Sequence, residues 1–369
     1  MKLLIFALAV SALQACTPAT PPVDALGLPP LPAQTASKNE PARIELGRKL
    51  FFDRRLSFNG SMSCAMCHVP EQGFTSTASK TAVGIEGKSL RRNAPGLLNV
   101  AWQTALFHDG REFSLATQAW LPLLNPDEMA NPSIGHVLQR LEMLPDYAGH
   151  FERAFDGAGP GMDTLGAAIS AFERTLVSAR SRFDRWRYGG EADVLSAVEQ
   201  QGFALFTGKA RCASCHQIGA SGALFADGRF HVTGAGQDAA GAAGVAITVP
   251  LAPGVQTVLS PSDLAAFEQT LPADLGRFEV TQDPADRWAF KTPSLRNVAR
   301  TPPYMHDGSL PTLAAVLDFY ERGGGTVAGK SPLLAPLHLT VAEKAALVAF
   351  LRSLDGANLD QQKSTERFR

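Results

Sequence analysis

The apolar residues of this 369-residue chain recur mostly at intervals of three and four, which places them on one face of an α-helix. The period-two alternation that indicates strands is sparse. Thr340 and Glu343 have the spacing of a capping box, in which each side chain bonds the backbone N–H of the other residue. The pattern therefore predicts a mainly α fold. The predicted helices cover Pro41 to Phe52, Ser133 to Leu144, Asp163 to Tyr188, Ala192 to Phe206, Thr312 to Glu321 and Thr340 to Leu354.

The first residues carry a different apolar pattern. The run from Leu3 to Leu13 is too short to cross a bilayer and is typical of a signal peptide. The sequence that ends at Cys16 resembles a bacterial lipobox, so we interpret residues 1–16 as a signal peptide with Cys16 as the lipidation site. The glutamine two positions before Cys16 is unusual there, and a cut near Ala15 by an ordinary signal peptidase is the alternative. The proline-rich stretch 17–37 is interpreted as a tether.

Two Cys-x-x-Cys-His pentapeptides use four of the five cysteines. Two thiols at this spacing can add to the two vinyl groups of one haem, and the adjacent histidine then ligates the iron. A zinc knuckle needs four matched ligands, and a redox dithiol needs no following histidine. The sequence therefore predicts two covalently attached haem c groups. The residues concerned are Cys64, Cys67, His68, Cys212, Cys215 and His216.

An internal repeat links the two motifs. Pro95 to Gly110 aligns without a gap on Pro293 to Gly308, with eight of sixteen positions identical. We interpret the chain as two cytochrome c-like haem domains produced by internal duplication. The predicted domains are an N-terminal unit at 38–188 and a C-terminal unit at 189–357, followed by a tail at 358–369. The second unit is longer, and its Gly/Ala-rich stretch from Gly234 to Gly254 is interpreted as a surface excursion or loop.

Comparing the repeats predicts that the two haems differ. Twelve residues beyond each repeat, Pro122 of the first unit corresponds to Tyr320 of the second. Proline cannot bind iron and tyrosine can, so the first haem would have an open face and the second a closed one. Met305 is a competing ligand because His/Met ligation is common in cytochromes c. The alternative for Tyr320 is a residue packed in the core.

Net charge and composition limit the kinds of molecule that the protein is expected to bind. The formal charge is −1 and no run of like charge stands out, so nothing predicts nucleic-acid binding. With 45% hydrophobic residues, the chain has enough apolar side chains for a sizeable core. Contact with a membrane is expected only through a lipid on Cys16.

A group of residues after the first repeat segment completes the pattern. It consists of Asp109-Gly110-Arg111, Gln118, Pro122, Leu124-Asn125-Pro126 and Glu128-Met129. With the two haem motifs, it resembles the peroxide-site signature of the bacterial diheme cytochrome c peroxidases and their relative MauG, and the resemblance covers nearly all of the mature length. The resemblance implies that Glu128 moves a proton between the two peroxide oxygens and that Gln118 hydrogen-bonds the bound oxidant. Pro122 would keep the pocket open. A solvated loop carboxylate is the alternative for Glu128.

The resemblance also bears on the second haem and on a metal site. The position of Tyr320 is methionine in the peroxidases and tyrosine in MauG, which favours a MauG-like oxidant. An anionic oxygen ligand lowers the reduction potential of a haem. The family's calcium site would carry over to Asn93, Thr301 and Pro303, through one side chain and two carbonyls.

Two departures from the family affect the mechanism. The tryptophan between the haems corresponds here to His108, so either His108 is the relay or another ring such as Trp102 or Trp120 serves. A histidine that stabilises a turn, like its repeat partner His306, is the alternative for His108. The loop 84–87 has no histidine that could close the first haem, so no reductive activation is expected.

The sequence thus predicts a periplasmic diheme oxidoreductase that uses hydrogen peroxide and takes electrons from a redox partner protein. In the favoured MauG-like version, a high-valent diheme state oxidises aromatic residues of that protein. In the peroxidase version, a small c-type cytochrome or a cupredoxin supplies the electrons. A diheme electron carrier without turnover is the third hypothesis, and the open face at Pro122 argues against it.

Overall fold

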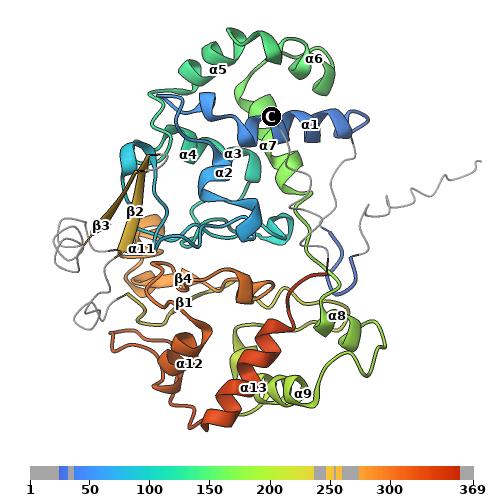
Figure 1. The fold of residues 1–369 in the computed structure, drawn as a ribbon, viewed down its shortest axis with the longest axis vertical. Helices are drawn as coiled ribbons and strands as arrows, with labels where there is room; N and C mark the ends of the chain where they lie inside the picture. The colour runs from blue at the N-terminus through green and yellow to red at the C-terminus, as the bar shows by residue number, and fades with distance from the viewer. Residues whose placement is uncertain (1–24, 32–36, 237–246, 253–254, 260–273, 358–369) are drawn as a thin grey trace, which may run out of the picture.

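A computed structural model describes residues 25–31, 37–236, 247–252, 255–259 and 274–357 (Figure 1). The predicted signal peptide with Cys16, most of the predicted tether and the tail lie outside the described residues. Among the helices of the described segments, none has both the length and the apolar character needed to cross a membrane.

The described chain is mostly helical with few strands, as the sequence predicts. The longer helices are α1 (Glu40–Phe52), α5 (Ile134–Glu142), α7 (Met162–Glu173), α9 (Ala197–Thr207), α12 (Leu313–Glu321) and α13 (Val341–Arg352). The shorter ones are α2 (Cys64–Cys67), α3 (Leu115–Gln118), α4 (Trp120–Leu124), α6 (His150–Ala154), α8 (Arg182–Arg187) and α11 (Phe278–Thr281). The predicted capping box of Thr340 and Glu343 is present at the start of α13.

Four short strands form two antiparallel pairs. Strand β1 (Phe230–Val232) pairs with β4 (Ala289–Lys291), and β2 (Ile247–Ala252) pairs with β3 (Val255–Leu259). For the stretch from Gly234 to Gly254 the sequence predicts a surface excursion or loop. The loop alternative is wrong for 247–252, where β-branched residues favour pairing with the similar stretch that follows. Residues 237–246 of that prediction lie outside the described part of the chain.

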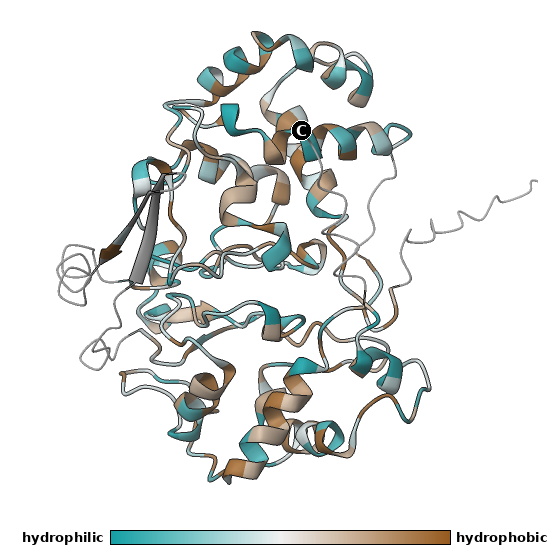
Figure 2. Cartoon of the chain, viewed as in Figure 1, coloured by the Kyte–Doolittle hydropathy of each residue, from teal (hydrophilic) through white to brown (hydrophobic). Residues whose placement is uncertain are grey.

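The apolar core has two main centres (Figures 1 and 2). In the first, α1 packs across α7 around Leu46, Leu50 and Leu165. In the second, α9 packs across α13 around Phe206 and Phe350. In each case the helix that precedes a Cys-x-x-Cys-His motif crosses a later helix, and this packing anchors the motif that follows.

A glycine lies at each of these crossings. A Cβ on Gly47 of α1 would lie 1.8 Å from the carbonyl oxygen of Ala168, and one on Gly202 of α9 would lie 2.1 Å from that of Ala346. Both glycines are followed at the same spacing by Leu-Phe. The backbones therefore approach more closely than any side chain would allow.

Replacing Gly47 by Ala is expected to lower the free energy of unfolding by about 1–3 kcal/mol, because the added methyl group would overpack the α1–α7 crossing. Gly135→Ala is the matched control, since the nearest atom to its added Cβ is Ser133 Oγ at 3.8 Å. This control should be neutral, or stabilise α5 by up to about 1 kcal/mol. Urea unfolding of the haem-loaded protein measures both, and equal midpoints for the two variants would contradict the prediction.

The predicted helix from Asp163 to Tyr188 is interrupted. Helix α7 ends at Glu173, and α8 begins after Ser181, whose side chain forms a capping box with Asp184. Between them Asn99 exchanges two hydrogen bonds with the backbone of Ser178, at 2.8 and 2.9 Å. These tertiary hydrogen bonds outweigh the helical pattern of the intervening residues.

The predicted helix from Ala192 is shorter than expected at its start. Helix α9 begins at Ala197, because Ser196 and Glu199 form a capping box there. The four residues that precede Ser196 form turns.

The two repeat segments share several features of backbone conformation. Asn99 and Asn297 have φ of 60° and 61°, and Phe107 and Met305 have φ of 63° and 73°. Each asparagine is followed by a single 3-10 turn, Val100–Trp102 in the first segment and Val298–Arg300 in the second. The sequence similarity between the segments therefore extends to their local structure.

Candidate active site

Each Cys-x-x-Cys-His motif forms a single tight turn. His68 N–H donates to the carbonyl of Cys64, and His216 N–H donates to that of Cys212, each at 2.9 Å. The four thiols of the motifs form no disulfide. Both turns thus keep their cysteines available and place a histidine directly after them.

The two histidines are oriented in the same way. His68 Nδ1 lies 3.1 Å from the carbonyl oxygen of Phe74, and His216 Nδ1 lies 2.7 Å from that of Phe225. A carbonyl can only accept, so Nδ1 carries the hydrogen and Nε2 keeps its lone pair for a metal. Burial lowers the pKa of both histidines, which favours the neutral form that ligates iron.

This donor set fits covalent haem at both motifs. Each offers two thiols for thioether bonds and one neutral imidazole with a free Nε2. A mononuclear zinc site would need more ligands than one motif supplies.

The peroxide-site residues predicted in the first unit lie on neighbouring elements. Gln118 ends α3, Pro122 lies in α4, and Glu128 follows α4 in a turn held by hydrogen bonds from Glu128 N–H to Asn125 and from Met129 N–H to Pro122. Burial and the nearby Glu128 raise the pKa of the Cys67 thiol to about 12. The Glu128 carboxyl is therefore close to the first haem-attachment motif.

The surroundings of Glu128 make its carboxyl a weaker acid than an exposed glutamate. Burial raises the pKa of Glu128 above its ordinary value, against the opposing effects of Asn125 and Arg111. Asn125 Nδ2 donates to Glu128 Oε1 at 2.8 Å and fixes the direction of the carboxyl. A half-buried carboxyl held in one orientation can pass a proton to a nearby oxygen.

The loop at 84–87 lies directly against this carboxyl-bearing turn. Ile85 N–H donates to the carbonyl of Glu128 at 2.9 Å. A Cβ on Gly84 would lie 1.8 Å from the carbonyl oxygen of Asp127, so only glycine fits there. The loop therefore supports Glu128 through its backbone.

An ion-pair network joins the two units, and the sequence did not reveal it. Arg92 binds Asp109 at 2.6 Å and Asp274 at 2.7 Å, and Arg91 binds Glu279. Burial opposes ionisation of Asp109, but Arg92 and Arg111 together lower its pKa. The spacing of these residues along the chain gives no sign that they meet, since Asp109 and Asp274 lie far apart in sequence.

Tyr320 lies in α12, close to the second motif. Burial raises its pKa, and the Cys212 and Cys215 thiols add to the effect. Met305 occupies a left-handed turn, which corresponds to Phe107 in the first unit. The phenol is thus within electrostatic reach of the haem-attachment cysteines, as a ligand of the second haem would be.

The three candidate relay rings have different surroundings. His108 Nε2 bonds the carbonyl oxygen of Asn93 at 2.9 Å, and its pKa falls to about 4 through burial and the nearby His306. His108 is therefore neutral and lies beside the second unit. Trp102 and Trp120 are buried, and their indole N–H groups donate to the carbonyls of Pro29 and Met162.

Asn93 connects the two units at the predicted calcium site. Its backbone N–H donates to the carbonyl of His306, and its amide nitrogen faces the carbonyl oxygens of Lys80 at 3.2 Å and Pro303 at 3.3 Å. The side-chain amide of Asn93 could equally be turned by 180°, since its oxygen and nitrogen have nearly the same size. Its Oδ1 would then face the carbonyl oxygens of Lys80 and Pro303, and three oxygens would lie together, as calcium requires. The Thr301 hydroxyl donates to the carbonyl of Val298, which leaves the predicted role of the Thr301 carbonyl untouched.

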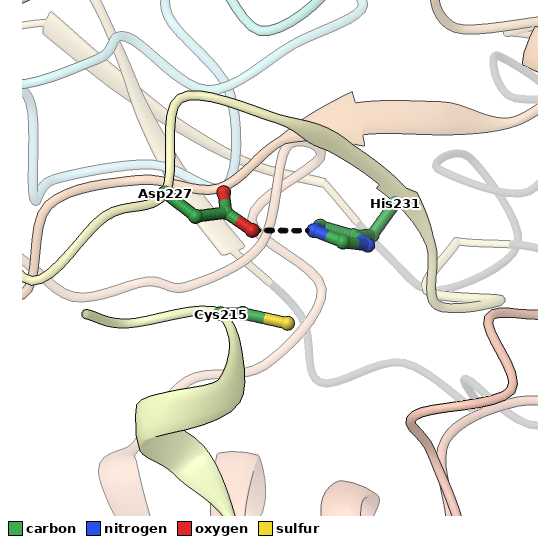
Figure 3. Close-up of side chains that lie close together, drawn as sticks. All are labelled: Cys215, Asp227 and His231. Atoms are coloured by element: carbon green, nitrogen blue, oxygen red, sulfur yellow. Dashed lines mark hydrogen bonds and ion pairs between the residues drawn. The ribbon is translucent and has the colours of Figure 1, made fainter.

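Cys215, Asp227 and His231 form a compact cluster that could bind a metal (Figure 3). His231 Nε2 lies 2.8 Å from Asp227 Oδ2. The Cys215 sulfur and Asp227 raise the pKa of His231 to about 9 despite burial. In a haem-loaded protein this sulfur is a thioether and cannot be a thiolate ligand, which leaves only the Asp227–His231 pair.

Comparisons with known proteins identify the family. Residues 41–193 match the family model described as di-haem cytochrome c peroxidase. The chain is 40% identical over 325 residues to the methylamine utilization protein MauG of Methylorubrum extorquens, covering 88% of this chain and 81% of that protein. It is 35% identical over 360 residues to the cytochrome-c peroxidase IdrP1 of Pseudomonas sp. strain SCT, covering 96% and 91%.

A solved structure is similar as well. It is described as a MauG-like protein associated with microbial copper homeostasis, and it superposes with a TM-score of 0.72 at 33% identity, covering 90% of this chain and 95% of its own. The relatives are peroxidases and MauG proteins, so the chain is a diheme oxidoreductase, and the family implies two c-type haems. The chain belongs to the di-haem cytochrome c peroxidase family that includes MauG.

Proposed function

We propose that this protein reacts with hydrogen peroxide at the haem of His68 and draws the electrons from a partner protein through the haem of His216. The observation that carries the proposal is the difference between the two units at one repeat position. Pro122 of α4 cannot ligate iron, whereas the half-buried Tyr320 of α12 lies near Cys212 and Cys215.

The residues of the first unit suit peroxide chemistry. Haem iron, when bound, supplies the electrons that break the O–O bond. Glu128 takes the proton from one peroxide oxygen and delivers it to the other, and its raised pKa allows it to hold that proton in between. Gln118 hydrogen-bonds the bound oxidant, and Pro122 leaves room for it.

We favour MauG-like oxidation of aromatic residues in the partner protein, because Tyr320 stands where the peroxidases have methionine. Reduction of peroxide to water with a small c-type cytochrome or cupredoxin as donor is the second candidate. The 35% identity to a cytochrome-c peroxidase over 96% of the chain supports it. His108 is proposed as a relay between the haems, since it is neutral and lies near His306.

Adding peroxide to the resting, haem-loaded protein tests the proposal. We expect the EPR spectrum of the resting protein to show one high-spin and one low-spin ferric haem. The high-spin signal would come from the haem of His68, whose iron would have no second protein ligand. A near-infrared charge-resonance band after peroxide would support the MauG-like version. Rapid turnover with a reduced cytochrome or cupredoxin would support the peroxidase version instead. Two low-spin haems and no reaction would leave only an electron carrier.

We infer that the two units, 38–188 and 189–357, descend from one duplicated cytochrome c-like domain. The equal φ values of Asn99 and Asn297 support this, as do the glycines Gly47 and Gly202 at the two helix crossings. We also propose that the protein is periplasmic and carries a lipid on Cys16. We propose in addition that a calcium ion binds at Asn93, Thr301 and Pro303.

A further inference from the structure

Glu173, the last residue of α7, is a buried carboxyl that the proposed mechanism does not use. Only 4% of its surface is exposed, and Oε2 has no hydrogen-bond partner. The preceding residue, Phe172, packs in one apolar cluster with Phe51 and Cys64. Glu173 also acts on the Cys64 thiol more strongly than Cys67 does. The carboxyl therefore lies beside the first haem-attachment motif.

The surroundings of Glu173 favour its protonated form. Burial alone raises its pKa to about 8, and no charged side chain contributes. Helix α3, which packs against α7, has no charged residue. On α1, the charged side chains Arg43, Glu45 and Lys49 bind residues within 146–154. Glu40 interacts instead with Arg174, the residue after Glu173, and Arg48 has a partner of its own. An unpaired carboxyl in such surroundings keeps its proton until another positive charge comes near.

A haem held by Cys64 and Cys67 would bring such a charge close to Glu173, because this carboxyl acts on the Cys64 sulfur that would attach it. Thioether bonds offer the carboxyl no hydrogen-bond donor, so the haem would act on Glu173 through its charge. Oxidation of the iron adds one positive charge to this poorly solvated region and favours the carboxylate.

We propose that Glu173 releases its proton when the haem held by Cys64 and Cys67 loses an electron, and so acts as a positioning residue for the reduction potential of this haem. The haem passes the electron to an external oxidant. The O–H bond of the carboxyl breaks, the electron pair stays on oxygen, and the proton leaves to solvent. The inference rests on the proposed function only in taking this haem to be redox-active.

Spectroelectrochemical titration of the haem-loaded full chain through pH 8 tests the proposal. In the wild type, the potential of the first haem is expected to fall by up to about 59 mV per tenfold decrease in proton concentration. In Glu173→Gln, which cannot ionise, the fall should be much smaller, and only the part due to other groups such as the propionates and Glu128 should remain. The first haem is followed through its high-spin absorption bands, so that its reduction potential can be measured separately from that of the second haem.

Glu199→Gln is the matched control. Glu199 is as buried as Glu173, at 5% exposure, but it belongs to α9 and is bonded by Ser196 and Arg182. Its variant should keep the wild-type slope. Identical slopes for Glu173→Gln and the wild type would overturn the proposal.

An infrared difference spectrum gives a second readout that does not need a variant. The carbonyl stretch of a protonated carboxylic acid should disappear when the first haem of the wild type is oxidised, and should be missing from Glu173→Gln in both states. If the variant does not fold, the wild-type spectrum decides alone, and an unchanged band would reject the proposal. Because neither experiment uses peroxide, a protein that fails to react with peroxide could still pass both.

Discussion

Glu128→Gln is expected to slow the reaction of the haem-loaded protein with hydrogen peroxide by about 10²- to 10⁴-fold, the usual contribution of a positioned acid or base. The amide keeps the size of the side chain and can still accept from Asn125, but it cannot take up a proton. Stopped-flow mixing with peroxide measures the rate. Spectra of the resting haems should stay unchanged, which separates lost proton transfer from lost structure.

The role of Glu128 also predicts how the rate of the peroxide reaction changes with pH. Glu128 must be ionised to accept the first proton, so the wild-type rate should fall as the pH drops through its pKa. Burial raises that pKa, so the fall should lie above the ordinary range of glutamate. Glu86→Gln is the matched control, because Glu86 is an exposed carboxylate on the supporting loop. Equal rates for Glu128→Gln and Glu86→Gln would remove the role assigned to Glu128.

Tyr320→Phe is expected to change the second haem from low-spin to high-spin and to raise its reduction potential by about one or more tenths of a volt, within the roughly 0.8 V range that axial ligands span. The reason is the loss of an anionic oxygen from the iron. Optical and EPR spectra of the resting protein, together with a redox titration, measure the change.

Two variants test the alternative ligand and the specificity of the effect. Met305→Leu should leave the spectrum of the second haem unchanged if Tyr320 is the ligand. Tyr304→Phe removes only a hydroxyl that donates to the carbonyl of Val298, and it should be silent as well. If Met305→Leu alters the haem and Tyr320→Phe does not, the second haem has the peroxidase type of ligation.

The parts of the fold that depend on local signals could be predicted from the sequence. The capping box at Thr340 fixed the start of α13, and the Cys-x-x-Cys-His spacing identified both haem motifs. The mainly helical class followed from the apolar periodicity. These features involve residues a few positions apart, so their physics is contained in a short segment.

Features that depend on distant contacts could not be predicted. The break after α7 requires Asn99 to bind Ser178, and the fit of loop 84–87 requires the carbonyl of Asp127. Glu173 ends an ordinary helical pattern, where a glutamate usually faces solvent, so its burial appears only once α1 and α3 are packed against α7. The three-residue strands β1 and β4 are too short to produce a periodic signal.

Ser178 also determines how the two halves are spaced. Its backbone bonds Asn99 of the first repeat segment, and its hydroxyl donates to Asn297 of the second at 2.9 Å. One serine thus bonds directly to both of the repeat segments that follow the haem motifs. Electron tunnelling falls off steeply with distance, and these hydrogen bonds hold the two segments in contact. We therefore expect the proposed electron transfer between the haems to follow driving force and to be insensitive to solvent viscosity.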